Sequence, residues 1–438
     1  MAQEGINRGW TVTSAGTGIN LALGVLYTWS IFKGAIKQSV EKGGPGDFNW
    51  DMASLNDPYA VCCLVFSVIM ILAGRIQDRF GPQRTAMIGG LLVGLGFILA
   101  STTTDYLSWV IGFGVLAGSG IAFGYSSATP AALKWFPPDK TGRITGIVVA
   151  GFGLASVYIA PLSQYLLNNF GIGRAMLFYG IAFPIVVCSL AVFLVNPPSG
   201  FVPEGFAERR RTREAGIVAS SAFEDTNTTP LQMLRSPMFW VLWLLYFIGA
   251  GAGLMVIGSL AGMAKASMGS KAFLAVAILA IGNAGGRIAA GMLSDKIGRK
   301  RTLASIFAFQ ALLMVASIYS IGGHSNALYI VLLATLIGFN YGANLSIFPS
   351  YAKDLWGMKN FGVNYGIIFT AWGVGGLVMS RVSQYLSAAG GGSYRSSFML
   401  AGALLTFGAV IALVMRDRKE EARQEFRRHM AAPLKQGI

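Results

Sequence analysis

Apolar stretches long enough to cross a lipid bilayer recur along the whole chain, separated by short polar segments. A helix needs about 20 residues to cross, because it rises about 1.5 Å per residue through a hydrocarbon core about 30 Å thick. The chain is therefore expected to be an all-α membrane protein. The pattern predicts twelve membrane-spanning helices, at residues 10–33, 58–76, 85–102, 106–131, 144–168, 174–196, 237–261, 271–293, 302–322, 327–350, 361–386 and 395–415.

One long polar insertion interrupts this pattern and divides the predicted spans six and six. Polar segments of this length between membrane spans are typical of a boundary between two helical bundles. We therefore expect four parts: an N-terminal six-helix bundle at 1–196, a central cytoplasmic loop at 197–236, a C-terminal six-helix bundle at 237–415 and a basic cytoplasmic tail at 416–438.

The composition and the distribution of charge agree with a multi-pass protein. Hydrophobic residues make up 54% of the chain and charged residues only 12%, about half the charged fraction of a soluble domain. The net charge is +15. If both termini are cytoplasmic, twenty-four lysines and arginines fall on the inner side and six on the outer side. This positive-inside bias predicts a plasma (inner) membrane protein with both termini cytoplasmic, and it explains the basic charge without a nucleic-acid partner.

The residues that usually carry enzymatic or metal chemistry are scattered. Cys62, Cys63 and Cys188 all fall inside predicted spans, so no disulfide framework is indicated, and neither His324 nor His429 lies in a span. There is no cluster of histidine, cysteine and carboxylate residues and no serine–histidine–aspartate set. We expect no enzyme activity, no metal and no cofactor.

The two halves of the chain repeat each other. The segments GRIQDRFGPQR (Gly74–Arg84) and GMLSDKIGRKR (Gly291–Arg301) share the pattern G-x-x-x-D-x-x-G-x-x-R, offset by 217 residues, at the end of the second span of each half. Parallel six-span repeats are the plan of a large transporter class that binds substrate between the halves and works by alternating access. Two further pairs of segments also correspond, Ala122–Ala128 with Gly338–Asn344 and Gly146–Gly153 with Gly366–Gly373.

The duplicated motif resembles the signature of the major facilitator superfamily, and the resemblance covers essentially the whole chain. It implies twelve helices in two pseudo-symmetric six-helix bundles. It also implies that the motif aspartates pair with arginines and helix ends on the cytoplasmic side and act as a conformational latch; the alternative is a tight, charged turn without a switching role. The residues concerned are Asp78, Arg79, Arg84, Asp295, Arg299 and Arg301.

Arg287 is a cation in the middle of a predicted span. It lies eight residues before Asp295, which corresponds to about 12 Å of helix and brings it close to the middle of the hydrocarbon core. A guanidinium at that depth costs several kcal/mol unless it faces the bundle interior, water or an anion. Asn283 lies one helical turn earlier on the same face. Beside this face runs a stripe of small residues that favours close helix packing, Gly282, Gly286 and Ala290.

No acidic residue is an obvious partner for Arg287 in the sequence. Only Asp57 approaches a span interior, where it is either an N-cap before Pro58 or a proton site. Arg287 could hydrogen-bond carbonyl groups of broken helices near Pro130 or Pro161. We favour the other interpretation, in which its missing counter-charge is an anionic substrate.

Two families within the superfamily narrow the substrate. The segment Val363–Gly376 resembles the oxalate/formate exchangers, which carry a lysine where this chain has Trp372. The pair Asn283–Arg287 resembles the monocarboxylate transporters, which have aspartate at the first position and a span-one lysine where this chain has Leu26. Arg287 has neither of these lysines nor the aspartate beside it, and this favours a substrate with a single carboxylate.

We therefore expect a monomeric secondary transporter that carries a short monocarboxylate, such as lactate, pyruvate, glycolate or formate, with a proton. An anion exchanger of the oxalate/formate type and a non-transporting sensor on the same scaffold are the alternatives. The expected substrate-binding residues are Arg287, Asn283, Tyr125, Tyr341, Leu26, Tyr27, Phe339, Phe369 and Trp372, although aromatic side chains in membrane helices also serve simple packing.

Overall fold

The computed structural model describes residues 7–198, 200–203, 227–268, 272–320, 327–391 and 393–415. All regular elements in this part of the chain are helical, which confirms the all-α prediction. The tail at 416–438 and most of the central loop, 204–226, lie outside the described residues.

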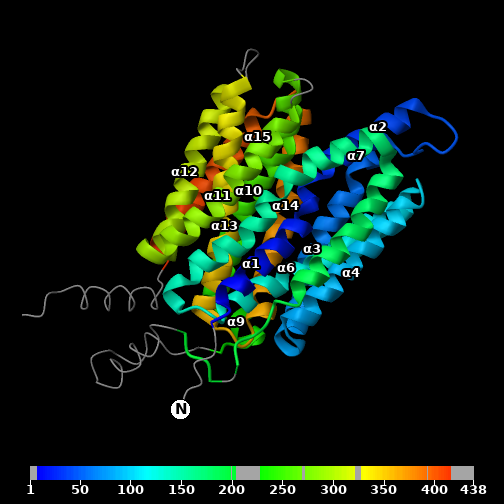
Figure 1. Ribbon diagram of the computed structural model, residues 1–438. Helices are drawn as coiled ribbons and strands as arrows, with labels where there is room; N and C mark the ends of the chain where they lie inside the picture. The colour runs from blue at the N-terminus through cyan, green and yellow to red at the C-terminus, as the bar shows by residue number, and fades with distance from the viewer. Residues whose placement is uncertain are drawn as a thin grey trace, which may run out of the picture.

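The described residues of the N-terminal half form seven α-helices and four short segments of other helix types (Figure 1). They are α1 (Gly9–Leu23), η1 (Gly24–Thr28), α2 (Trp29–Lys42), η2 (Met52–Asn56), α3 (Asp57–Phe80), α4 (Pro82–Ser101), α5 (Tyr106–Trp109), η3 (Val110–Ala117), α6 (Gly118–Leu133), η4 (Pro138–Lys140) and α7 (Thr141–Ala191).

After the central loop a short helix, α9 (Pro230–Leu234), leads into the long helices of the C-terminal half. Figure 1 shows these helices beside the N-terminal ones, with their axes running in the same general direction. They are α10 (Pro237–Met268), α11 (Ala272–Ile297), α12 (Arg299–Ser320), α13 (Ala327–Trp356), α14 (Phe361–Ala389) and α15 (Arg395–Val414).

Eleven helices among the described residues are long and apolar enough to cross a membrane. One of them, α7, has 51 residues and is interrupted at Gly171, whose φ of 78° lies in the region that only glycine adopts easily. The 51 residues of α7 exceed one crossing, and the break at Gly171 falls between the predicted spans 144–168 and 174–196. The structure thus accounts for all twelve predicted spans, although the first continues to Lys42 rather than ending at residue 33.

The repeated motif makes the same turn in both halves. Gly81 between α3 and α4 has a φ of 86°, and Gly298 between α11 and α12 has a φ of 96°. A side chain would be strained at either position, because this left-handed backbone region is disfavoured for residues with a Cβ atom. The second glycine of the motif is therefore required by the turn itself. We call the end of the molecule that carries these two turns the motif end.

The halves meet along two matching seams, α3 against α14 and α7 against α11. In each seam glycines bring the backbones into contact. Gly146 of α7 faces the carbonyl of Arg287, and Gly366 of α14 faces the carbonyl of Met70. Because Met70 precedes Arg287 by the motif offset, these contacts are equivalent in the two seams.

The small-residue stripe on α11 is a close helix contact, as predicted. Gly282 packs against the backbone of Thr335, and Gly286 packs against the backbone of Phe339, both on α13. A Cβ atom at either glycine would overlap the facing carbonyl. This packing fixes the rotation of α11 and so turns the neighbouring face, which carries Asn283 and Arg287, toward the other half of the protein.

Candidate functional site

The first membrane span is not a continuous α-helix. α1 ends at Leu23 and a 3₁₀ turn, Gly24–Thr28, precedes α2. Gly24 permits the turn to lie against α7, since a Cβ atom there would meet the carbonyl of Phe152. The turn buries Leu26 completely and directs the hydroxyl of Tyr27 toward Arg287. A local break in a membrane helix thus positions two of the predicted site residues.

Arg287 is completely buried, with 0% of its surface exposed. Its Nε donates to Oδ1 of Asn283 at 2.9 Å, and Nη1 donates to the carbonyl oxygen of Val149 on α7 at 2.6 Å. Nη2 lies 3.4 Å from the hydroxyl of Tyr27, and the guanidinium carbon lies 5.9 Å from the ring centre of Phe152. Both halves of the chain therefore contribute to its surroundings.

All of these partners are neutral. No carboxylate in the described part of the chain forms an ion pair with Arg287, and the described acidic residues lie at helix ends or in loops. A guanidinium has five N–H donors, and the three contacts above leave two of them for another acceptor. The backbone bond foreseen as an alternative does exist, but it goes to Val149 rather than to a carbonyl near Pro130 or Pro161.

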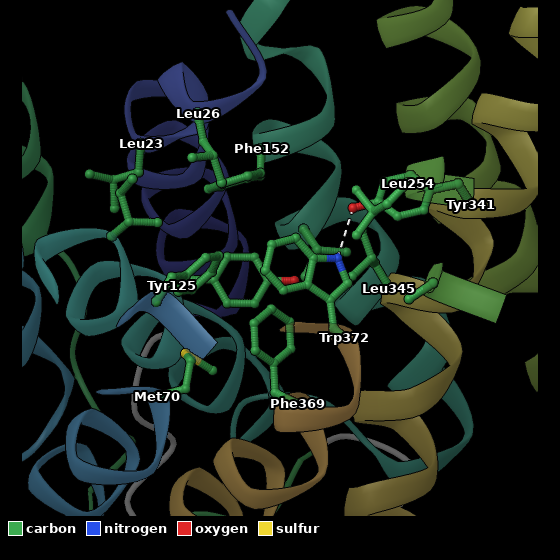
Figure 2. Packing of buried hydrophobic residues seen from close by; sticks show 14 of the residues in the cluster. Leu23, Leu26, Met70, Tyr125, Phe152, Leu254, Tyr341, Leu345, Phe369 and Trp372 are labelled. Atoms are coloured by element: carbon green, nitrogen blue, oxygen red, sulfur yellow. Dashed lines mark hydrogen bonds between the residues drawn. The ribbon is translucent and has the colours of Figure 1, made fainter. Parts of the chain in front are cut away.

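A chain of hydrogen bonds continues from Tyr27 into the C-terminal half. The hydroxyls of Tyr27 and Tyr341 are 2.8 Å apart, and the indole Nε1 of Trp372 donates to the hydroxyl of Tyr341 at 2.8 Å (Figure 2). Tyr341 and Trp372 are buried. The tryptophan at the position where a lysine would be expected in an oxalate/formate exchanger therefore orients the two tyrosines and adds no charge.

Packed rings form the remaining wall of this cluster. Phe369 stacks on Trp372 with centroids 5.1 Å apart and an interplanar angle of 18°. Tyr125 lies edge-on to Phe152 at 5.5 Å and tilted against Phe369 at 5.7 Å. Figure 2 shows these rings converging from α6, α7 and α14. The structure thus brings Tyr125, Phe369 and Trp372 together.

Two rings of this wall were not anticipated. Phe152 lies below the guanidinium, and Phe66 of α3 contacts both Phe369 and Trp372. The internal repeat could have predicted Phe152, because it occupies the position in Gly146–Gly153 that Trp372 occupies in Gly366–Gly373. The repeat also contained a signal for Phe66, because the offset of 217 residues makes it the counterpart of Asn283.

Two predicted residues lie apart from this cluster. Phe339 is half-buried, and its ring lies against Gly285 on α11. Asp57 is the first residue of α3 and accepts a hydrogen bond from the hydroxyl of Tyr106 at 2.8 Å. The structure thus places Asp57 at a helix start, at the opposite end of α3 from the motif.

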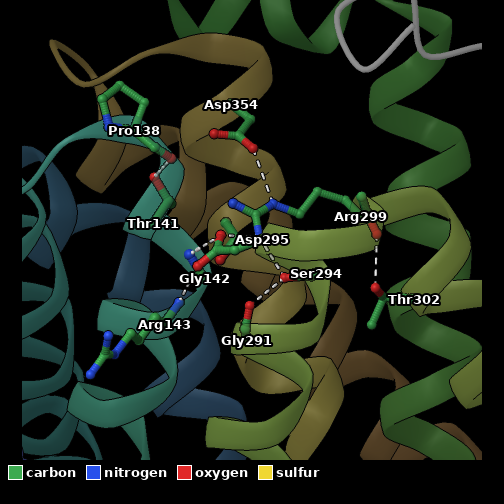
Figure 3. Close-up of polar contacts among 12 residues, drawn as sticks. Pro138, Thr141, Gly142, Arg143, Gly291, Ser294, Asp295, Arg299, Thr302 and Asp354 are labelled. Atoms are coloured by element: carbon green, nitrogen blue, oxygen red, sulfur yellow. Dashed lines mark hydrogen bonds and ion pairs between the residues drawn. The ribbon is translucent and has the colours of Figure 1, made fainter. Parts of the chain in front are cut away.

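The motif aspartates cap helices of the opposite half. Asp78 accepts hydrogen bonds from the backbone N–H groups of Gly362 and Val363, both at 3.0 Å, at the start of α14. Asp295 accepts from those of Gly142 and Arg143, at 2.8 and 2.7 Å, at the start of α7 (Figure 3). A carboxylate is favoured at a helix N-terminus because it satisfies free N–H groups and complements the helix dipole.

The cap formed by Asp295 is reinforced by a buried cation. Arg299 is only 6% exposed and forms ion pairs with Asp295 at 2.7 Å and with Asp354 of α13 at 3.1 Å. It also donates to Ser294 at 2.5 Å. Pro82 occupies the position equivalent to Arg299 in the other half, so the two caps differ in charge. Arg79, Arg84 and Arg301 are exposed at the motif end.

Comparisons with known proteins agree with this architecture. A sequence model of the Major Facilitator Superfamily matches residues 14–380 and 276–437. The chain is 27% identical over 355 residues to the oxalate:formate antiporter of Oxalobacter formigenes, covering 80% of this chain and 77% of that protein. It is 26% identical over 347 residues to monocarboxylate transporter 13 of Bos taurus, covering 78% and 76%.

The fold is also similar to a solved structure, the crystal structure of the Escherichia coli fucose:proton symporter. The TM-score is 0.63 at 14% sequence identity, and the match covers 91% of this chain and 98% of the symporter. The family match spans most of the sequence, and the helices, the duplicated motif and the two seams agree with it. The chain belongs to the major facilitator superfamily of membrane transporters.

Proposed function

We propose that this protein is a secondary active transporter of short monocarboxylates of the lactate or pyruvate kind, which it carries together with a proton by alternating access. The observation that carries the proposal is the burial of Arg287 among neutral partners only, in the described part of the chain. A buried guanidinium without a protein counter-charge is stabilised by an anion that binds to it.

The available donors of Arg287 suit a carboxylate. A carboxylate accepts two parallel N–H bonds from a guanidinium, which fixes both its position and its orientation. Asn283 and Val149 hold Nε and Nη1 in place, so the remaining N–H bonds have a defined direction. Substrate binding therefore needs no large rearrangement of the arginine itself.

One buried cation at this site supports one carboxylate on the substrate. Apart from Arg287, the buried charged side chains among the described residues include only Arg299, which is engaged at the motif end. Trp372 adds an indole N–H group and no charge. The names of the two relatives, an oxalate:formate antiporter and a monocarboxylate transporter, agree with small carboxylates as the substrate class.

We propose that the transport cycle opens and closes the contacts between the two halves along the two seams. The halves 1–196 and 237–415 would rock against each other, with the motif end facing the cytoplasm and both termini on that side of the plasma (inner) membrane. The caps at Asp78 and Asp295 hold the motif end closed and would open when substrate is released inward. A proton accompanying the anion would balance the charge that the anion adds to the site.

The direct test is counterflow of labelled lactate into proteoliposomes that contain the purified protein. We expect uptake by the wild type and a loss of about tenfold or more for Arg287→Lys, because an ammonium cannot form the two-pronged contact with a carboxylate. Arg381→Lys is the matched control, since Arg381 is exposed on α14. Equal uptake by Arg287→Lys and the wild type would contradict the proposal.

Anion exchange is the second candidate function, and the similarity to an oxalate:formate antiporter favours it. An exchanger needs a second anion on the opposite side of the membrane, whereas a symporter needs only a proton gradient. Liposomes preloaded with buffer alone therefore separate the two. Accumulation of lactate without an internal anion supports symport, and a strict requirement for internal formate or lactate supports exchange.

A further inference from the structure

Three buried tyrosines from three different helices surround the ring of Phe369. The ring centre of Phe369 lies 5.7 Å from that of Tyr125 on α6, 5.7 Å from that of Tyr365 on α14 and 6.2 Å from that of Tyr246 on α10. Tyr246 and Tyr365 played no part in the sequence-based prediction. We call Tyr125, Tyr246 and Tyr365 the tyrosine triad.

The three hydroxyl groups of the triad are buried, and none has a hydrogen-bond partner of acceptable geometry in the described part of the chain. The side chain of Tyr365 is nevertheless within hydrogen-bonding reach of both Tyr125 and Tyr246. Contacts of poor geometry among the three phenols compensate only in part for the hydrogen bonds to water that burial removed. The arrangement suits an occupant that can both donate and accept hydrogen bonds.

Tyr125 connects the triad to the proposed anion site. Its ring contacts Phe152, over which the guanidinium of Arg287 lies, and on its other side it contacts Phe369. The charge of Arg287 also acts on Tyr125 and Tyr246. The triad therefore adjoins the proposed anion site through the rings of Tyr125 and Phe152.

The triad contains no cation, so it does not favour a second carboxylate. Phenol hydroxyls suit uncharged oxygen atoms, because each can donate one hydrogen bond and accept others. A hydroxyl or keto oxygen on the carbon next to the carboxylate lies within a few ångströms of the charged end of such an acid. Phenol hydroxyls beside the anion site would therefore distinguish 2-hydroxy and 2-oxo acids from unsubstituted acids of the same size.

We propose that Tyr125, Tyr246 and Tyr365 form a second subsite of the proposed substrate-binding site, which binds the 2-hydroxy or 2-oxo group of a monocarboxylate and so selects such acids over their unsubstituted analogues. The inference rests on the proposed function, since Arg287 is taken to hold the carboxylate. A site built to hydrogen-bond a substrate oxygen rejects the analogue that lacks it, because its own polar groups are then left unpaired.

The test compares lactate with propionate, which has the same carbon chain without the hydroxyl. Both acids compete against labelled lactate for the purified protein in proteoliposomes. We expect the wild type to bind lactate about tenfold or more tightly than propionate. In the triple variant Tyr125→Phe, Tyr246→Phe and Tyr365→Phe, we expect this ratio to fall toward one, because lactate binding weakens much more than propionate binding. Each substitution removes only an oxygen atom, so the ring packing around Phe369 is retained.

Tyr179→Phe is the matched control, because Tyr179 is buried in α7 and its hydroxyl bonds to Ser163; the ratio should stay at its wild-type value. Equal wild-type affinities for lactate and propionate, with both dependent on Arg287, would overturn the subsite while leaving the proposed function intact. An equal loss for both acids in the triple variant would also overturn it, since the tyrosines would then only support the cavity. Failure of both acids to bind in an Arg287-dependent manner would instead overturn the proposed function.

Discussion

At the scale of single residues, the environment of Arg287 is the most informative feature of the protein. Taking a guanidinium out of water costs several kcal/mol, and its bonds to Asn283, Val149 and Tyr27 offset only part of that cost, since neutral acceptors interact with a cation less strongly than a carboxylate does. Asn283 is the closest side chain on the same helix. Its lack of charge is therefore as important to the site as the presence of the arginine.

The variant Asn283→Asp tests this balance. It keeps the size of the side chain but places a carboxylate where Oδ1 now lies, 2.9 Å from Nε of Arg287. We expect monocarboxylate affinity near neutral pH to fall about tenfold or more, because the new internal ion pair competes with the substrate. Affinity should recover as the pH is lowered, since a protonated aspartic acid is neutral like asparagine.

The measurement for this variant is competition against labelled lactate over a range of pH values, with the wild type titrated in parallel. Asn168→Asp on the exposed face of α7 is the control for an added charge that does not reach Arg287. An affinity that is unchanged at every pH would show that the arginine does not hold the substrate carboxylate.

At the scale of helices, the seams between the halves depend on glycines at equivalent positions. Gly146 and Gly366 each admit a carbonyl of the opposite helix at a distance that no side chain would allow. Such contacts align α7 with α11 and α3 with α14, and they leave no room for adjustment because the obstructing atoms are backbone. The caps at Asp78 and Asp295 then fix the register of each seam at the motif end.

We expect Gly146→Ala to prevent this seam from closing, because its Cβ atom would overlap the carbonyl of Arg287. Transport should fall about tenfold or more, and the motif end should become more accessible to water-soluble thiol reagents at a cysteine introduced beside Gly142. Gly285→Ala on α11 is the control, since a Cβ atom there meets only the edge of Phe339 at 3.9 Å. Normal transport and unchanged accessibility in Gly146→Ala would argue against the close seam.

A second prediction at the scale of helices concerns the stability contributed by the ion pairs of Arg299. Its partners Asp295 and Asp354 have only 10% and 8% of their side chains exposed, so water screens their charges weakly. We expect Arg299→Met to lower the free energy of unfolding by about 3 kcal/mol, because removing one partner of a buried ion pair leaves the others with repelling charges. Thermal unfolding in detergent measures the change, and Arg301→Met, at an exposed position, should leave the melting temperature almost unaltered.

At the scale of the whole molecule, transport needs two states of similar free energy. The state described here closes the motif end through both seams and both caps, with Arg287 buried between the halves. The two caps differ, because Arg299 reinforces only the cap at Asp295. Opening at the motif end therefore breaks a charged cluster on one seam and a simple helix cap on the other.

For the complete transporter we expect lactate uptake into proteoliposomes to rise when the outside is made more acidic than the inside. A co-transported proton would then move down its gradient and drive the anion inward. Initial rates with and without an imposed pH gradient, at a clamped membrane potential, measure the coupling. Uptake that ignores the gradient but depends on an internal anion would assign the protein to the exchangers.

The amino-acid sequence by itself determined the helical class, the twelve spans, the duplicated motif and the presence of one arginine inside an apolar span. These features depend on hydropathy and on spacing within a single helix, so they can be counted along the chain. The pairing of Arg287 with Asn283 belongs to the same category, because residues four apart lie on one face of a helix.

Only the tertiary structure decided what else surrounds that arginine. Its contacts with Val149 and Tyr27 join residues separated by 138 and 260 positions, and the tyrosine triad combines three helices from both halves. No periodic pattern encodes such neighbours, since they depend on how each helix is rotated and where glycines let backbones touch. The same reason explains why Phe339, which lies in the repeated segment Gly338–Asn344, is outside the cluster of rings near Arg287. Phe66, by contrast, lies within that cluster.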